Sequence, residues 1–216
     1  MIKQNHSGIL TPLKKAFPVT IPVMLGYLFV GMAFGMLLEE KGYNYLWALL
    51  SSLTVYAGSM QFVLVNLLAS GTALLETALL TLIINFRHIF YGLSFLDTFK
   101  GMGKKKPYMI FSLTDETYSL LCSADVPPGV NPNTYFFCIA ALDQLYWVTG
   151  SIVGALIGSA IEFNTKGIDF AMTALFAVIF VEQWQSCPTH KPALAGLGVA
   201  LLALLTIGPQ SFVIPA

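Results

Sequence analysis

Two short clusters of polar side chains interrupt otherwise apolar sequence, and their residue types suit the binding of a charged solute. The first cluster contains an amide, a guanidinium, an imidazole and a phenol: Asn85, Arg87, His88 and Tyr91. The second sets two adjacent carboxylates close to a phenol: Asp115, Glu116 and Tyr118. Ionisable groups inside a membrane span are costly and normally face a cavity or a partner. We therefore interpret the two clusters as parts of a pathway for something both polar and charged.

The composition indicates a polytopic membrane protein. Hydrophobic residues make up 56% of the 216-residue chain, charged residues make up 10%, and the mean hydropathy is +0.73. Soluble domains average about 25% charged residues. The apolar runs reach about 20 residues, which is enough to cross a hydrocarbon core of about 30 Å. They must be helices, because no water satisfies backbone groups there and no run alternates as a barrel strand does.

The sequence predicts an all-α, polytopic transmembrane helical bundle that forms one membrane domain over residues 1–216. About seven apolar segments are expected, some of them broken or re-entrant: 17–38, 46–69, 73–96, 108–122, 134–161, 168–184 and 192–207. The first is longer than a signal-peptide core and is not followed by an Ala-x-Ala cleavage site, so we expect it to be retained. The apolar end at Ala216 resembles the beginning of a further span.

Small residues at every fourth position mark places where helices can approach closely. Such rows are Gly31 with Gly35, and Gly150 with Gly154 and Gly158. The longer row shares a helical face with Trp147 and with Asp143, a carboxylate that needs a partner at that depth. We interpret the glycines as packing positions, and the longer row offers more close-packing surface than a small single bundle needs.

A weak internal repeat is present. The tripeptide at 77–79 recurs at 173–175, and the same offset aligns Arg87 with Gln183. Three spans per repeat would invert the second copy, and this inverted three-plus-three arrangement is found in many secondary transporters.

The basic residues give conflicting indications of orientation. Lys14 and Lys15 favour a cytoplasmic start, whereas four lysines at 100 and 104–106 favour a cytoplasmic loop after the third segment. Three complete crossings cannot place both groups on one side. Either an early segment is re-entrant or broken, or the chain starts outside. We place residues 98–107 in the cytoplasm.

The third apolar segment presents two polar faces. Arg87 and Tyr91 align at a spacing of four residues, while His88 falls on another stripe and Asn85 lies slightly off it. Arg87 could extend to the membrane surface or point inward, and its polar neighbours favour the inward arrangement. His88 could shuttle protons, since imidazole titrates near physiological pH, or could simply pack.

The second apolar segment carries small and polar groups at mid-membrane: Gly58, Ser59 and Gln61. This run could unwind a helix, and the freed amides at the start of a half-helix would then favour a substrate carboxylate. Alternatively the helix continues, and Ser59 and Gln61 bond to neighbouring helices.

The carboxylates Asp115 and Glu116 lie centrally in the short fourth segment. Adjacent residues on a helix point about 100° apart, so the two should serve different partners. One could pair with Arg87 while the other carries a proton, or both could form a structural ion pair that joins two helices.

The sequence gives little support for an enzyme or for a cofactor. It contains no His-Glu-x-x-His zinc motif, and Ser59 lacks the Gly-x-Ser-x-Gly context of a nucleophile. The three cysteines lack metal-ligand spacing and are interpreted as small apolar space-fillers. A net charge of zero gives no electrostatic case for nucleic-acid binding.

Three motifs in order, Tyr56 to Phe62, Arg87-His88-x-x-Tyr91-Gly92 and Thr114 to Tyr118, closely resemble the AzlC family. These are the large subunits of bacterial branched-chain amino acid exporters, and the resemblance extends from Phe17 to Pro209. It implies a multi-pass protein of the cell membrane that works with a small hydrophobic subunit of the AzlD type. It also implies export of leucine, isoleucine, valine and sometimes methionine, here expected to be driven by an ion gradient.

The residues fit such a substrate. A zwitterion needs a positive site, for which Arg87 or the Gly58–Ser59 backbone is a candidate, and a negative site, for which Asp115, Glu116 or Asp143 is a candidate. Two rival functions remain open: a proton or cation channel, and a subunit that supports assembly without transport.

Overall fold

The computed structural model describes residues 9–160, 170, 177, 180–181, 184–185 and 189–207. The described chain is helical, as predicted. Its helices are α1 (Leu10–Glu40), α2 (Tyr45–Thr54), α3 (Gly58–Ser70), α4 (Leu74–Asn85), α5 (Arg87–Ser94), α6 (Leu96–Lys100), the 3₁₀ turn η1 (Gly103–Lys105), α7 (Lys106–Phe111), α8 (Asp115–Ser123), α9 (Pro132–Ala160) and α11 (Lys191–Ile207). The predicted segment 168–184 lies mostly outside the described residues.

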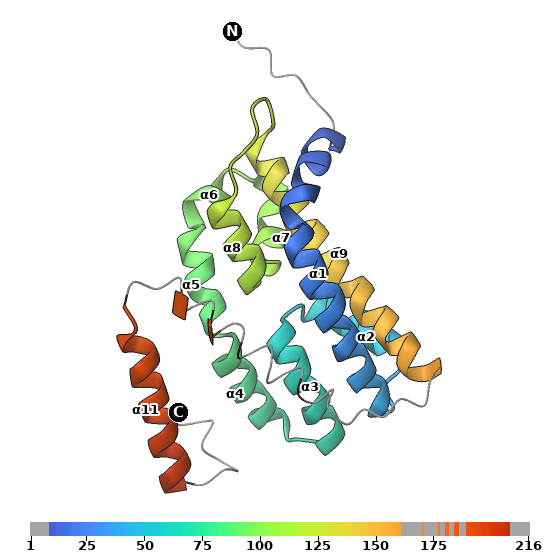
Figure 1. Cartoon of the computed structure of the whole chain (residues 1–216), viewed down its shortest axis with the longest axis vertical. Coiled ribbons are helices and arrows are strands. Elements are labelled where there is room, and N and C mark those ends of the chain that lie inside the picture. Colours follow the sequence, from blue (N-terminus) through green and yellow to red (C-terminus); the bar gives the residue numbers. More distant parts are fainter. Residues whose placement is uncertain are drawn as a thin grey trace.

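The long helices α1 and α9 lie against each other along most of their length and form the frame of the molecule (Figure 1). Both glycine rows are at this contact. A Cβ at Gly31 would lie 3.1 Å from the backbone nitrogen of Ser151, and one at Gly150 would lie 2.8 Å from the carbonyl oxygen of Leu28. Gly35 and Gly154 approach the opposite backbone still more closely. The prediction that the glycines serve packing is therefore confirmed, and α1 covers the row on α9.

Two groups of buried side chains identify the two ends of this frame. At one end, Ala16 of α1 packs with Phe99 of α6 and Tyr135 of α9. At the other end, Leu38 of α1 packs with Ala48 of α2 and Ala155 of α9. We call these the α6 end and the α2 end.

Helices α2 and α3 form a re-entrant hairpin that begins and finishes at the α2 end (Figure 1). The hydroxyl of Tyr43, just before α2, donates to the carbonyl of Leu68 near the end of α3, at 3.2 Å. With 10 and 13 residues, these helices are about 15 and 20 Å long, too short to cross a core of about 30 Å alone. The predicted segment 46–69 is thus broken.

Helices α7 and α8 form a second hairpin, which enters from the α6 end. Lys105, just before α7, donates to the hydroxyl of Thr134 at the start of α9, at 2.9 Å. Leu121 near the end of α8 belongs to the same buried cluster as Tyr135. The predicted segment 108–122 is therefore two helices, joined at Ser112–Thr114.

Helices α4 and α5 together cross from the α2 end to the α6 end, with a bend of 45° between them. The sequence predicts one continuous segment there, residues 73–96. By length and composition, α1, α9 and this bent pair could each cross a membrane, among the residues that were described.

The hairpins remove the conflict between the two groups of lysines. Because the α2–α3 segment returns to the side it entered from, Lys14, Lys15 and the lysines at 100 and 104–106 all belong to the α6 end. A hairpin followed by a crossing segment therefore occurs twice, with the second hairpin entering from the opposite end. The tripeptide at 173–175 lies outside the described residues, so the predicted three-plus-three register stays a prediction.

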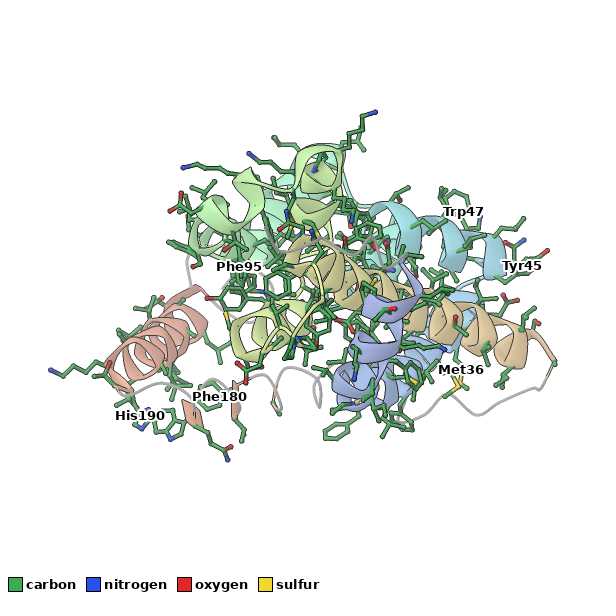
Figure 2. The ribbon with its side chains drawn as sticks, turned by 90° about the horizontal axis from the view of Figure 1, so that it is seen from above. Met36, Tyr45, Trp47, Phe95, Phe180 and His190 are labelled. Carbon is green, nitrogen blue, oxygen red and sulfur yellow. The ribbon has the colours of Figure 1, made fainter. Side chains whose placement is uncertain are left out.

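Large apolar side chains cover much of the outer surface. Viewed from above, Tyr45 and Trp47 lie at the outer edge of α2 (Figure 2), and they are 43% and 48% exposed. Exposed aromatic rings near a helix start are typical of the membrane–water boundary.

Candidate functional site

The tip of the first hairpin is the three-residue break before α3. Tyr56 has a φ of 41°, an uncommon conformation for a residue with a side chain, and it allows the chain to reverse between the two helices. Ala57 is the N-cap of α3, and its side chain can accept no hydrogen bond from the first turn. Of the two interpretations left open by the sequence, the broken helix is the one found: the helical run is interrupted at residues 55–57, and α3 begins at Gly58.

The tip of the second hairpin is built differently. Thr114 is the N-cap of α8, and its hydroxyl oxygen accepts from the backbone N–H of Thr117 at 3.3 Å. Asp115 and Glu116 occupy the first helical turn, where negative charge is favoured by the helix dipole. The two tips face each other, since the rings of Tyr56 and Phe111 lie 6.1 Å apart.

Arg87 joins the two tips. It is the first residue of α5 and therefore lies directly after the 45° bend between α4 and α5. The Nη2 group donates to the Ser59 hydroxyl and lies 2.9 Å from Oδ2 of Asp115. The side chains of Arg87 and Asp115 are 25% and 18% exposed. The inward position of Arg87 and its pairing with one of the two carboxylates are thus confirmed.

Tyr91 supports the ion pair from one turn further along α5. Its hydroxyl donates to Oδ1 of Asp115, so the two carboxylate oxygens have different partners. Its ring stacks on Tyr118 of α8 with centroids 4.5 Å apart. The expected common face of Arg87 and Tyr91 is therefore confirmed. Tyr118 does not bond Asp115 itself but packs against the ring of Tyr91, which does.

Glu116 and Asp143 are linked by hydroxyl groups and not by a cation. The hydroxyl of Tyr27 on α1 lies 2.7 Å from Oε2 of Glu116 and 2.6 Å from the hydroxyl of Thr114. The Thr117 hydroxyl lies 3.1 Å from that of Thr114 and 2.8 Å from Oδ2 of Asp143. Tyr27, Thr114, Thr117 and Asp143 are buried, and Asp143 has a hydrogen-bond partner on one of its two oxygens, Oδ2.

Gln61 belongs to a structural network behind the first tip. Its amide nitrogen lies 3.4 and 3.2 Å from the hydroxyls of Ser51 and Ser52, and its oxygen accepts from the Trp147 indole at 2.9 Å. These bonds fasten α3 to α2 and α9. Gly58 leaves room for the same indole, since a Cβ there would lie 3.2 Å from the ring. Both residues therefore position the tip.

His88 and Asn85 lie next to the ion pair and bond locally. Nδ1 of His88 is 3.1 Å from the carbonyl of Asn85, and its ring meets Tyr91 edge-on at 5.7 Å. The side-chain oxygen of Asn85 is buried and has no hydrogen-bond partner within the described part of the chain. It could therefore accept a bond from a solute.

Three hydroxyls of this site were not predicted as site residues: Tyr27, Thr114 and Thr117. Both threonines flank the acidic pair, so a Thr-Asp-Glu-Thr run at a helix start was a usable signal for a capped tip. Tyr27 is an isolated phenol in a 31-residue apolar helix, and no local pattern indicates its role.

A metal centre and an apolar pocket are the other kinds of site that such a fold could hold. Among the described residues, no group of three or more His, Cys, Asp or Glu side chains could hold a metal ion. An apolar pocket of about 160 Å³ lies between α1, α2 and α3, bordered by Leu38, Trp47 and Leu64. It is lined by few polar groups, so it is poorly suited to the charged ends of a zwitterion.

Comparisons with known proteins agree with the sequence motifs. The family model described as "AzlC protein" matches residues 22–161. The branched-chain amino acid transport protein AzlC of Bacillus subtilis is 43% identical over 98% of this chain and 84% of its own length. An uncharacterized membrane protein of Helicobacter pylori is 43% identical over 96% of this chain and 91% of its own length. The inner membrane protein YgaZ of Escherichia coli is 28% identical over 86% and 80%. No solved structure matches significantly.

Proposed function

The chain belongs to the AzlC family and is a membrane transport protein, and from this and the geometry above we propose that it exports branched-chain amino acids. The observation that carries the proposal is the Arg87–Asp115 pair held between the tips of two opposed hairpins. Half-helix ends that meet at mid-membrane are the usual place for a transported solute.

A zwitterion can replace the ion pair without leaving a charge uncompensated. Its carboxylate would bind Arg87 and the free N–H groups at the start of α3, beside Ser59. Its ammonium would bind Asp115, which Tyr91 already orients. The carboxylate would be bound by α3 and α5, and the ammonium by α8. Binding would therefore draw the two tips together.

The α6 end is proposed to face the cytoplasm. It holds the lysines at 14, 15, 100 and 104–106, whereas the α2 end holds Glu39, Glu40, Lys41 and Glu76. Excess lysine in short loops marks the cytoplasmic side. A multi-pass position in the cell membrane with this orientation follows, and the second hairpin then opens toward the substrate pool.

A small hydrophobic subunit of the AzlD type is proposed as partner on the basis of the family resemblance. The glycine row on α9 does not argue for it, because α1 fills that row. The exposed apolar side of α4 is a better candidate surface, with Leu74, Leu75 and Leu82 between 60% and 88% exposed.

The proposal is tested in cells fed a leucine-containing dipeptide. Cells that carry the gene should excrete leucine, and cells without it should accumulate leucine. Arg87→Gln should abolish most of the excretion, because the partly buried Asp115 would lose its cationic partner and the substrate carboxylate would lose its positive site.

Lys100→Gln is the matched control. It also neutralises the cation of an ion pair, since Lys100 lies 2.7 Å from Asp97, but that pair is exposed at the surface. Surface pairs contribute about 1 kcal/mol or less, so excretion should remain normal. If Arg87→Gln is inserted normally and excretes leucine at the wild-type rate, the proposed site is wrong. Leucine efflux that competes with valine would exclude a channel.

A further inference from the structure

Between Glu116 and Asp143 lies a continuous chain of three hydroxyl groups. Its four oxygen–oxygen contacts are Glu116 to Tyr27 at 2.7 Å, Tyr27 to Thr114 at 2.6 Å, Thr114 to Thr117 at 3.1 Å, and Thr117 to Asp143 at 2.8 Å. These are hydrogen-bond distances for hydroxyl donors. The chain joins helix α8 to both helices of the frame.

The number of protons in this chain determines its charge. Each hydroxyl has one hydrogen and can donate one bond. Three hydroxyls can therefore supply only three of the four bonds. The fourth must come from a carboxyl group at one end, because two carboxylates would leave one contact without a proton between two oxygens.

The hydrogen bonds of this hydroxyl chain can all point in either direction. With the proton on Glu116, each group donates to the next: Glu116 to Tyr27, then Thr114, then Thr117, then Asp143. With the proton on Asp143, all three hydroxyls turn and donate the opposite way. In both orders Thr114 also accepts the backbone N–H of Thr117, and each of the four contacts has one proton.

None of the ionisable groups around the two carboxyls competes with them for this proton. Around Glu116 these are Arg87 from α5, Asp115 on the same helix and Tyr27 from α1. Asp115 is already paired with Arg87. Around Asp143 the neighbours are phenols, namely Tyr56 at the first tip, Tyr108 on α7 and Tyr146 on α9. Phenols retain their protons near neutral pH.

We infer that Glu116 and Asp143 share one proton, and that this hydroxyl chain is the path by which the transporter couples amino acid movement to a proton. In one transfer, the Glu116 proton passes to Tyr27, the Tyr27 proton to Thr114, the Thr114 proton to Thr117, and the Thr117 proton to Asp143. One O–H bond forms and one breaks at each hydroxyl, so only the two carboxyls change charge. This rests on the proposed function, since Glu116 adjoins the Asp115 that would bind the ammonium.

The first experiment does not depend on transport. Infrared spectra of the purified full-length protein at neutral pH should contain the carbonyl band of a protonated carboxylic acid. That band should be lost in the double variant Glu116→Gln with Asp143→Asn, and should shift in Thr117→Val. Thr117→Ser keeps the hydroxyl and should restore the wild-type band. A spectrum without this band, or a band that survives the double variant, overturns the shared proton.

The second experiment measures protons and leucine together in liposomes that contain the full transporter. Tyr27→Phe and Thr117→Val should each lower the number of protons moved per leucine at least tenfold. The two substitutions combined should lower it no further, because the loss of one hydroxyl already interrupts the path. Tyr146→Phe is the matched control. It removes a buried phenolic hydroxyl that bonds the hydroxyl of Thr20 at 3.0 Å and is not part of the hydroxyl chain. It should leave the ratio unchanged.

The outcomes of the two experiments separate the inference from the proposed function. An unchanged ratio of protons to leucine in both Tyr27→Phe and Thr117→Val overturns the coupling path even when leucine transport is normal. If the wild-type protein moves no branched-chain amino acid, the proposed function fails, whereas the infrared result still decides whether Glu116 and Asp143 share a proton.

Discussion

The two hairpin tips have the same backbone plan and opposite electrical character. A helix start carries partial positive charge because its first N–H groups lack partners within the helix. At α8 this charge is offset by Asp115 and Glu116 and by the Thr114 cap. At α3 the cap is Ala57, and the first turn contains no acidic residue in the described structure. The α3 tip is thus suited to an anion and the α8 tip to a cation.

This difference determines the orientation in which a zwitterion would bind at the central site. Arg87 lies between the tips, contacting Ser59 on one side and Asp115 on the other. A zwitterion bound there would have its carboxylate toward α3 and its ammonium toward α8. Its apolar side chain would then point away from both helix starts.

The largest expected effect concerns the sides from which the hairpins enter. In a background without native cysteines, Lys41→Cys and Ala73→Cys flank the α2–α3 hairpin, whereas Lys104→Cys and Asp125→Cys flank the α7–α8 hairpin. A membrane-impermeant thiol reagent should label the first pair in intact cells and spare the second, an all-or-none contrast.

Labelling of the second pair after the cells are opened is the control for reactivity. Reaction of Lys41→Cys and Lys104→Cys from the same side would mean that the first hairpin crosses the membrane. Labelling of only the second pair in intact cells would keep the hairpins but reverse the orientation.

The next effect comes from making the α3 tip resemble the α8 tip. Ser59→Asp places a carboxylate in the first turn of α3, beside Arg87, where the helix dipole favours it. The protein should fold, but the new charge should repel the substrate carboxylate and raise the KM for leucine roughly tenfold, about 1.4 kcal/mol. Concentration-dependent uptake into inverted vesicles measures this change.

Ser59→Asn is the control, since it has similar size and no charge. The comparison between the tips would be wrong if Ser59→Asp binds leucine as tightly as Ser59→Asn does. Greater damage from Ser59→Asn than from Ser59→Asp would indicate a steric effect in place of a charge effect.

A change in stability, in place of one in substrate binding, is expected from the frame, which holds both tips. Gly35→Ala would push a methyl group into the backbone of Ser151 and Ala155 on α9, and overpacking of this kind costs about 1–3 kcal/mol. The midpoint of thermal unfolding in detergent should fall. Gly26→Ala on the same helix is the control, because that position has no described atom within 4 Å of an added Cβ. Equal stability of the two variants would mean that the α1–α9 contact adapts.

The sequence alone was sufficient to predict which charged residues of the site would pair and which residues would share a helical face. Arg87 and the acidic pair carry opposite charges in neighbouring apolar segments, and buried charges require partners, so their contact could be predicted. The face shared by Arg87 and Tyr91 follows from helical spacing. The break at Gly58 was one of two open interpretations.

Other features depend on contacts between distant parts of the chain. Gln61 has the same local signal as Ser59, yet it bonds Trp147, 86 residues away, and fastens the tip in place of facing Arg87. Tyr27 gains its role only when α1 packs beside α8. The turn that makes α2–α3 re-entrant requires Tyr56 at positive φ, and a tyrosine gives no indication of this, since positive φ is usually signalled by Gly, Asn or Asp.

The smallest effect is expected for His88, whose residue type first suggests a proton shuttle. Its Nδ1 is occupied by the Asn85 carbonyl at 3.1 Å, and the hydroxyl chain at the α8 tip connects the carboxyls without it. His88→Gln should therefore change the leucine transport rate by less than twofold and should leave its dependence on pH unchanged. Rates measured from pH 5.5 to 8.5 in liposomes check this, with Thr117→Val as the variant that should alter the profile. Loss of the pH dependence in His88→Gln would move the proton chemistry from the α8 tip to α5, and the two tips would then differ in charge alone.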